Sequence, residues 1–201
     1  MNVLELFCGT KSFSKECKKL GFETFTVDIN NKFKPTLCKN VLDLKIKDIP
    51  FIPDIIWASP PCTQYSKAKS RGVRDIKGAN KIVLKTLQLI MKLNPKYWII
   101  ENPQTGLLKK QDFMKKLPFT DISYCMYGDD YRKQTRLWNN FGLKLNTCNK
   151  NCGKIVDGKH IGSAGNGRKK YTYKNFKKEE KYVIPKLLCK EILKQIGVKK
   201  K

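Results

Sequence analysis

Short β-prone runs alternate with helical segments along most of the chain, and this alternation restricts the possible folds more than any other feature. At the start, residues 2–7 predict a strand, residues 13–20 a helix that ends at Gly21, and residues 22–28 a second strand. A strand, a turn, a helix and a returning strand in this order form the usual crossover between two parallel strands. The opening of the chain therefore predicts an α/β unit.

The same alternation continues to the end of the chain. Further strands are predicted at 54–58, 97–100, 121–127 and 135–138, and further helices at 79–93, 109–117 and 185–196. Residues 146–175 are polar, rich in Gly and Lys, and without periodicity, so they predict irregular structure. The pattern as a whole predicts an α/β fold with a mostly parallel sheet and helices on both faces.

The chain is strongly basic. Its 201 residues include 42 Lys and Arg against 17 Asp and Glu, which gives a formal charge of +25. A hydrophobic content of 40% argues against a disordered basic tail, and a folded body with this charge attracts nucleic acid. Only five of the cations are Arg, and a Lys-rich surface can also reflect an A/T-rich coding sequence. The charge therefore predicts a polyanionic partner without defining its sequence.

The sequence lacks the signals of export and membrane insertion. No uncharged apolar run reaches the roughly 18 residues of a membrane span, and no basic stretch leads into an apolar one at the N-terminus. We therefore expect a soluble, intracellular chain that is not secreted and does not contact a membrane. Its eight cysteines are widely spread, which argues against a disulfide framework.

Four chemically useful segments follow predicted strands. They are the turn at 7–9, Asp28, the turn Pro60-Pro61-Cys62, and Glu101. In open α/β sheets, ligands bind beyond the carboxyl ends of the strands. We therefore expect these four segments to lie at one rim of the sheet.

The first two segments suggest a cofactor site. A Gly9 turn before a helix lets the backbone approach a cofactor closely, and Asp28 suits the hydrogen-bonding of a ribose diol. Each feature alone is common in ordinary turns, but the two together favour a cofactor that contains a nucleoside. Lys11 and Ser12 replace the further glycines of a dinucleotide site, which counts against NAD.

The other two segments suggest nucleophilic chemistry. Two prolines stiffen the turn that presents Cys62, although a buried structural cysteine would explain the turn equally well. Arg71 and Arg74 follow closely, and cations near the thiol would favour the thiolate and suit contact with phosphate. Glu101 supplies an acid at the same rim. A thiol and a carboxyl beside a nucleoside cofactor suggest nucleophilic attack with proton delivery.

Six short motifs in this order resemble the DNA cytosine-5 methyltransferases. They are Leu-Glu-Leu-Phe-Cys-Gly at 4–9, Val-Asp at 27–28, Leu-Asp at 42–43, Ser-Pro-Pro-Cys at 59–62, Glu-Asn-Pro at 101–103 and Gln-Thr-Arg at 134–136. The resemblance extends over about 140 residues and the closing helix, and it is greatest to the compact phage- and virus-type members.

The resemblance implies a Rossmann-like fold that binds S-adenosylmethionine. Phe7, Gly9 and Pro61 would line the pocket of this cofactor. Asp28 would hold the ribose, and Asp43 would meet the adenine amino group.

The resemblance also implies a mechanism on double-stranded DNA. Cys62 would attack C6 of a cytosine that is flipped out of the duplex, and Glu101 would hydrogen-bond or protonate N3. Arg136 would bind the carbonyl oxygen of the base. The candidate DNA contacts are Ser66, Arg71, Arg74, Gln134 and Arg168.

Three features depart from the family pattern. Trp138 occupies the position where many members carry a second Arg. No Gly-Asn element precedes the last helix, and its absence implies that part of the cofactor pocket is rebuilt. The predicted catalytic domain consists of 1–139 with 177–201, which leaves only 140–176 as a basic target-recognition insert. An insert of this size predicts a short recognition sequence or dependence on a partner.

The insert contains three side chains that could bind zinc. Cys148, Cys152 and His160 are such candidates, but no fourth ligand is obvious and their spacing is unusual. The sequence therefore favours ordinary loop residues over a metal site.

Three other functions stay open. An amino-methyltransferase uses an aromatic residue where this chain has Cys62. RNA is an alternative substrate, because the tRNA-modifying relatives share the Pro-Cys and Glu-Asn turns. An inactive or regulatory nucleic-acid-binding protein would explain Trp138 but not the intact Cys62, Glu101 and Arg136. We expect a monomer, with a recognition partner as an alternative.

Overall fold

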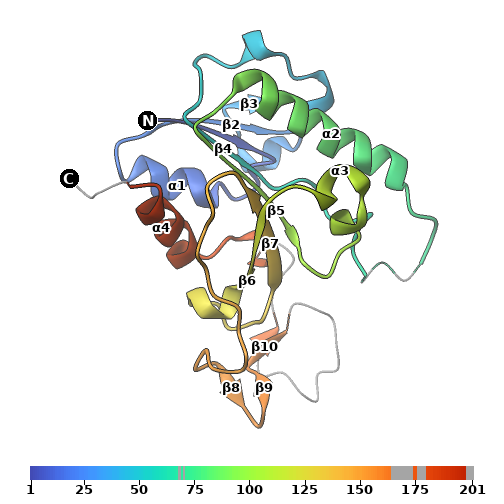
Figure 1. The fold of residues 1–201 in the computed structure, drawn as a ribbon, viewed down its shortest axis with the longest axis vertical. Coiled ribbons are helices and arrows are strands. Elements are labelled where there is room, and N and C mark those ends of the chain that lie inside the picture. Colours follow the sequence, from blue (N-terminus) through green and yellow to red (C-terminus); the bar gives the residue numbers. More distant parts are fainter. Residues whose placement is uncertain (68, 70, 164–173, 176–179, 198–201) are drawn as a thin grey trace.

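A seven-stranded sheet forms the centre of the computed structural model, which describes residues 1–67, 69, 71–163, 174–175 and 180–197 (Figure 1). The strands are β1 (Asn2–Leu6), β2 (Glu23–Asp28), β3 (Leu37–Cys38), β4 (Ile55–Ala58), β5 (Tyr97–Pro103), β6 (Phe119–Ser123) and β7 (Gln134–Asn139). Their order is β3-β2-β1-β4-β5-β7-β6. Strands β1 to β5 pair in parallel, and β7 is antiparallel to both β5 and β6. The prediction of a mostly parallel α/β sheet is confirmed.

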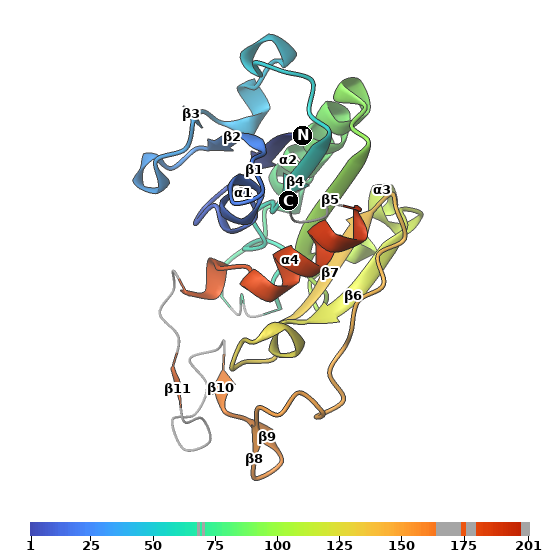
Figure 2. The same cartoon turned by 90° about the vertical axis from the view of Figure 1, so that its left-hand side faces the viewer.

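Helices cover both faces of this sheet. Helices α1 (Ser12–Lys18) and α4 (Lys186–Gln195) lie on one face, in front of the sheet in Figure 2, and α2 (Ile76–Leu93) lies behind it. Successive strand residues point to opposite faces, so Val3 packs in the cluster that contains α1 and α4, and Leu4 packs in the cluster that contains α2. Each face of the sheet therefore has its own apolar core.

Helix α2 begins three residues earlier than the predicted helix at 79–93. Its first turn is capped by Asp75, whose Oδ1 accepts a hydrogen bond of 2.7 Å from the backbone N–H of Gly78. A cap of this kind satisfies one of the free amides at a helix start. Helix α4 lies within one residue of the predicted 185–196.

Two predicted elements are shorter than expected. The predicted helix at 109–117 is reduced to α3 (Asp112–Lys115), which follows a 3₁₀ turn. The predicted strand at 121–127 ends at Ser123, because the chain turns into a 3₁₀ segment, η5 (Tyr124–Tyr127), that ends at Gly128 with a φ of 96°. This turn buries Tyr124 against the sheet instead of extending the strand.

The stretch at 146–175 contains short strands that periodicity did not reveal. Strands β8 (Ile155–Val156) and β9 (Lys159–His160) form a hairpin around Asp157 and Gly158, which both have positive φ. Asp-Gly is a favoured hairpin turn. Strands β10 (Gly162–Ser163) and β11 (Lys174–Asn175) pair in parallel.

The chain stays on the body for several residues after β7. Leu143 is buried in the core beside α4, and the backbone N–H of Lys144 donates to Oε1 of Gln195 at 2.9 Å. The division into 1–139 with 177–201 and an insert at 140–176 stays a prediction. Among the described helices, none is both long and apolar enough to cross a bilayer.

Candidate active site

A cavity of about 420 Å³ opens beyond the carboxyl ends of β1, β2, β4 and β5. This volume lies within the range of sites that bind small molecules and cofactors. The predicted site residues that line the cavity are Phe7, Gly9, Asp28, Pro61, Cys62 and Glu101. The structure therefore brings together the four strand-end segments that the sequence placed at one rim.

The turn after β1 forms one end of the cavity. Gly9 has a φ of 45°, and its backbone N–H donates to Oδ2 of Asp28 at 2.9 Å. The other carboxylate oxygen of Asp28 accepts the N–H of Asn30 at 2.8 Å. A side chain on Gly9 would meet only the carbonyl oxygen of Phe7, at 3.9 Å, so the space beside the glycine is open. An open backbone cradle next to an oriented carboxylate fits the ribose of a nucleoside.

Two residues before α4 complete this end of the cavity. Tyr182 and Ile184 line it, and the N–H of Ile184 donates to Oγ of Ser12 at 3.1 Å. They occupy the part of the chain where the Gly-Asn element of the family is missing. The aromatic and aliphatic side chains thus supply a wall that the sequence pattern alone did not identify.

Glu5 is a further cavity residue that the sequence analysis missed. Its Oε2 accepts the backbone N–H of Ser14 at 2.9 Å, near the start of α1. Burial raises the pKa of Glu5 to about 7, against the opposing effect of the hydrogen bonds from Ser14. The signal was an acid inside an apolar strand, two positions before the predicted cofactor turn at 7–9.

Asp43 does not line the cavity. It ends the 3₁₀ turn η2 (Val41–Asp43) and is exposed. Lys32 and Phe33 of the 3₁₀ turn η1 (Asn31–Phe33) line the cavity instead. The predicted contact of Asp43 with an adenine has no support in this geometry.

The turn with Cys62 follows β4, and contacts with β5 and with the loop after it fix its position. The side chain of Asn102 donates from Nδ2 to the carbonyl oxygen of Pro60 at 2.8 Å, and this contact is buried. The N–H of Tyr65 donates to the carbonyl oxygen of Cys62 at 3.0 Å. Strand β5 therefore determines where the β4 turn presents its thiol.

The pKa of the Cys62 thiol is raised. Burial is the main cause, the charge of Glu101 adds to it, and the charge of Lys133 opposes it. The cation that acts on this thiol is Lys133, and the predicted effect of Arg71 and Arg74 on the thiolate has no support in this geometry.

The two arginines have other positions. The guanidinium of Arg74 donates to the carbonyl oxygens of Gln64, Ser66 and Lys69 at 2.8–2.9 Å, so it organises the loop after Cys62. Arg71 is exposed outside the cavity lining.

Glu101 takes part in a polar group that includes a residue the sequence analysis missed. Only 6% of Glu101 is exposed, and its Oε1 accepts the hydroxyl of Tyr124 at 3.1 Å. Nζ of Lys133 lies 3.3 Å from the same oxygen and 4.6 Å from the centroid of the Tyr124 ring. Burial, followed by the charge of Glu101, raises the pKa of Tyr124 well above its usual value, so the hydroxyl stays a donor. Lys133 lines the cavity beside Glu101.

Arg136 lies outside the cavity lining, and its guanidinium is paired with another residue. Its guanidinium makes two hydrogen bonds of 2.7 and 2.8 Å to the carboxylate of Asp121, and it stacks 3.4 Å from the centroid of Phe119. Leu137 is the direct partner of Glu101 in the β5–β7 register, so the neighbouring Arg136 faces the opposite side of the sheet. Arg136 supports the β6–β7 pair and not the cavity.

Gln134 and Ser66 also lie outside the cavity lining. Gln134 belongs to β7, where its carbonyl oxygen accepts the N–H of Gln104 at 3.0 Å. Ser66 lies in the loop after Cys62, and Arg168 is outside the described residues. Cys148, Cys152 and His160 gather in the insert.

The mostly parallel seven-stranded sheet with helices on both faces is a Rossmann-like methyltransferase fold, and its cavity lies beyond the carboxyl ends of the strands. The family model described as "C-5 cytosine-specific DNA methylase" matches residues 1–118. A protein of Frog virus 3 (isolate Goorha), named "Probable DNA (cytosine-5)-methyltransferase", is 32% identical over 166 residues, which cover 74% of this chain and 75% of that protein. The chain belongs to the C-5 cytosine-specific DNA methylase family, whose methyl donor is S-adenosylmethionine.

Solved structures agree on the fold. A DNA modification methyltransferase encoded in a prophage of E. coli superposes with a TM-score of 0.55 and 20% identity, over 69% of this chain and 46% of that one. The S. pombe Dnmt2 methyltransferase superposes with a TM-score of 0.52 and 16% identity, over 72% of this chain and 52% of that one. The chain thus spans about half the length of these two structures.

Proposed function

We propose that this chain transfers a methyl group from S-adenosylmethionine to C5 of a cytosine in DNA, through a transient bond from Cys62. One observation carries the proposal: the thiol of Cys62 and the carboxyl of Glu101 line the same cavity as the Gly9–Asp28 turn. The donor and the acceptor of the methyl group would therefore meet in one space.

The cofactor end of the cavity would bind and orient the methyl donor. Asp28 would accept hydrogen bonds from the ribose hydroxyls, and the open backbone at Gly9 would allow the cofactor to approach closely. Phe7 and Pro61 would contact the apolar surface of the cofactor. When bound, S-adenosylmethionine supplies an electrophilic methyl group on a sulfonium.

The chain's own groups would activate the base. Attack of the Cys62 sulfur on C6 moves an electron pair toward N3, where Glu101 would hydrogen-bond or deliver a proton. This leaves C5 electron-rich and able to accept a methyl group. Loss of the C5 proton and departure of the thiolate then restore aromaticity. The base must leave the stack, because C6 is out of reach inside a duplex.

Glu101 would also couple base binding to activation of the thiol. In the free protein its charge contributes to the raised pKa of Cys62. The proton that the Cys62 thiol loses would pass to the Glu101 carboxylate and be shared with N3 of the base, which reduces this charge and favours the thiolate when a cytosine occupies the site. The nucleophile would thus form where its target is present.

We assign to Lys133 the part that the resemblance gave to Arg136. Its ammonium is held 3.3 Å from Oε1 of Glu101, in the cavity lining, and its charge favours the Cys62 thiolate. Lys133 would fix the carboxyl and supply a cation beside the carbonyl oxygen of the base.

Double-stranded DNA is the proposed substrate, with a monomer as the active form. The charge of +25 would drive phosphate contact, and Arg71 and Arg168 stay candidates for it. Because the insert at 140–176 is small, the proposed recognition sequence is short, or a partner protein contributes to it.

The first test identifies the methylated atom. The protein is incubated with labelled S-adenosylmethionine and with matched duplex DNA and RNA, and the nucleosides are separated after digestion. We expect 5-methyldeoxycytidine from DNA. Label in 5-methylcytidine from RNA alone would show that RNA, and not DNA, is the substrate. Label on an exocyclic amine would refute the C5 chemistry. Cofactor binding without transfer would indicate a regulatory protein.

A second test separates Lys133 from Arg136. We expect Lys133→Gln to lower kcat by about 100-fold, because one preorganised charge is lost at the site of reaction. The same change should shift the pH profile of Cys62 alkylation to higher pH, since Lys133 lowers the pKa of this thiol. Alkylation is followed on the Cys62 peptide by mass spectrometry.

Arg136→Gln is the matched control. It removes a cation three positions after Lys133, on β7, and breaks the pair with Asp121, so we expect a lower midpoint of thermal unfolding. Below that temperature its kcat and its Cys62 alkylation profile should match those of the unmodified protein. If Arg136→Gln abolishes turnover in a folded protein while Lys133→Gln does not, the assignment of Lys133 is refuted.

A further inference from the structure

Four potential zinc ligands gather where the insert meets the sheet. They are the Sγ atoms of Cys125, Cys148 and Cys152 and a ring nitrogen of His160, all within 4.8 Å of one another. We propose that these four side chains form a structural zinc site that joins the insert to the body. Cys125 is the fourth ligand that the sequence analysis lacked.

The distances suit a tetrahedral ion. Zinc–sulfur bonds of about 2.3 Å at tetrahedral angles separate neighbouring ligand atoms by about 3.8 Å. The Sγ of Cys148 and the Nε2 of His160 are 3.4 Å apart, and the remaining pairs lie within the limit of 4.8 Å. Small rotamer adjustments would place all four atoms around one ion. Three cysteines and one histidine are a common ligand set of structural zinc.

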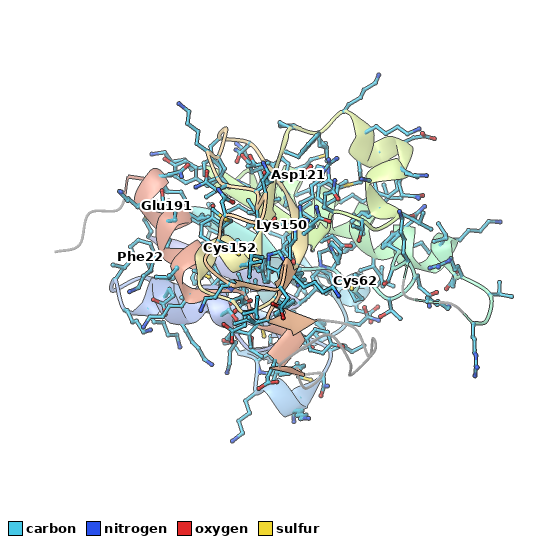
Figure 3. All side chains as sticks on the ribbon, turned by 90° about the horizontal axis from the view of Figure 1, so that it is seen from below. Phe22, Cys62, Asp121, Lys150, Cys152 and Glu191 are labelled. Atoms are coloured by element: carbon cyan, nitrogen blue, oxygen red, sulfur yellow. The ribbon has the colours of Figure 1, made fainter. Side chains whose placement is uncertain are left out.

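The ligands come from separate parts of the chain. Cys125 belongs to η5, directly after β6 in the body, whereas His160 lies on β9 of the insert hairpin. Cys148 and Cys152 lie between them in the chain. Figure 3, viewed toward the insert, shows Cys152 and Lys150 apart from Cys62. A shared ion would therefore crosslink the insert to the edge of the sheet.

The turn around Cys148 is already arranged for a metal-bound thiolate. The N–H of Lys150 donates to the Sγ of Cys148 at 3.2 Å, and Lys150 and Gly153 have φ values of 66° and 70° that fold the chain back on itself. The N–H of Cys148 donates to Oγ of Ser123 at 3.0 Å, which ties this turn to β6. Backbone donors to a ligand and its turn are the outer contacts that orient zinc sites.

The charges around the cluster suit a zinc–thiolate centre. Arg132 and Lys150 lie close enough to His160 for their charges to act on its ring. Three thiolates and one zinc ion carry a net charge of −1, which complements these nearby cations.

The position of the site suggests what the ion does. Cys125 follows Tyr124, whose hydroxyl bonds to Glu101. Zinc would thus hold the basic insert against the segment that supports the base end of the cavity. This second role rests on the proposed function, whereas binding of the ion does not.

Metal analysis tests the site directly. We expect protein purified without added metal, then dialysed, to retain a single zinc ion per chain by mass spectrometry of the metal. Replacement by Co²⁺ should give the intense ultraviolet absorption of cobalt–thiolate bonds and the visible bands of tetrahedral cobalt. Cys125→Ser and His160→Ala should lose most of the zinc or weaken its retention against a chelator by at least 100-fold.

Two controls make the result specific to the cluster. Cys38→Ser, at an exposed cysteine on β3, and Cys62→Ser, in the cavity, should each retain the zinc. Unmodified protein that binds neither zinc nor Co²⁺ after reduction, or a disulfide among Cys125, Cys148 and Cys152 in the purified protein, would overturn the proposal. Unmodified protein that retains zinc but transfers no methyl group would leave the metal site standing and refute the proposed function, so the two proposals fail separately.

Discussion

Replacement of Cys62 by Ala is expected to abolish both methyl transfer and the covalent adduct with DNA that contains 5-fluorocytosine. Without the sulfur at C6, C5 of the cytosine is too poor a nucleophile to accept the methyl group. Transfer should therefore fall by at least about 10³-fold. In this DNA a fluorine replaces the C5 hydrogen that must leave as a proton in the last step. The bond to Cys62 therefore persists, and the unmodified protein should remain bound to such DNA through denaturing electrophoresis.

The Cys62→Ala protein should still bind S-adenosylmethionine, because the proposed ribose contacts come from the Gly9–Asp28 turn after β1 and β2, whereas the thiol follows β4. Calorimetric titration with the cofactor checks this point. Cys38→Ala is the matched control, since Cys38 is exposed on β3 and outside the cavity lining. Normal C5 transfer by a folded Cys62→Ala protein would contradict the mechanism. Transfer to the exocyclic amine would favour the amino-methyltransferase alternative.

Much of this site could be predicted from the sequence because parallel strands share an edge. Gly9, Asp28, Cys62 and Glu101 each follow or end a β-prone run, and the sheet brings the carboxyl ends of these runs together whatever the connecting segments do. The prediction therefore needed only the strand ends and no distances between side chains.

The choice between Lys133 and Arg136 could not be made in this way. The two residues are three positions apart, and a shift of one residue in a strand exchanges the faces of the sheet. The β5–β7 register, in which Leu137 lies opposite Glu101, decides the question. No feature of the motif at 134–136 indicates that register, and the buried Trp138 shows only that β7 continues into the core.

Cys125 was missed for a different reason. Ligands of small zinc sites are recognised by close spacing in the sequence, but Cys125 precedes Cys148 by a whole strand and its loop. It reaches the cluster because the predicted strand at 121–127 ends early and turns at Tyr124. The error in that strand end and the missing fourth ligand therefore have the same cause.

Glu101→Gln is expected to lower turnover while making the Cys62 thiol more reactive. Glutamine cannot supply a proton to N3, so kcat should fall by about 10²- to 10⁴-fold, with little change in the affinity for S-adenosylmethionine. The same substitution removes a negative charge that raises the pKa of Cys62. The pKa of the thiol should therefore fall, and the pH profile of Cys62 alkylation should shift to lower pH.

These opposite effects distinguish a role at the base from a role in folding. A disrupted cavity would lower turnover and cofactor affinity together, and it would expose Cys62 without a defined shift of its pH profile. Glu101→Gln keeps the size of the side chain, and its amide oxygen can still accept the hydroxyl of Tyr124. Single-turnover rates, cofactor titration and alkylation of the Cys62 peptide measure the three quantities on one preparation. Equal losses of turnover and cofactor affinity, with an unchanged alkylation profile, would show that Glu101 acts on the pocket and not on the cytosine or the thiol.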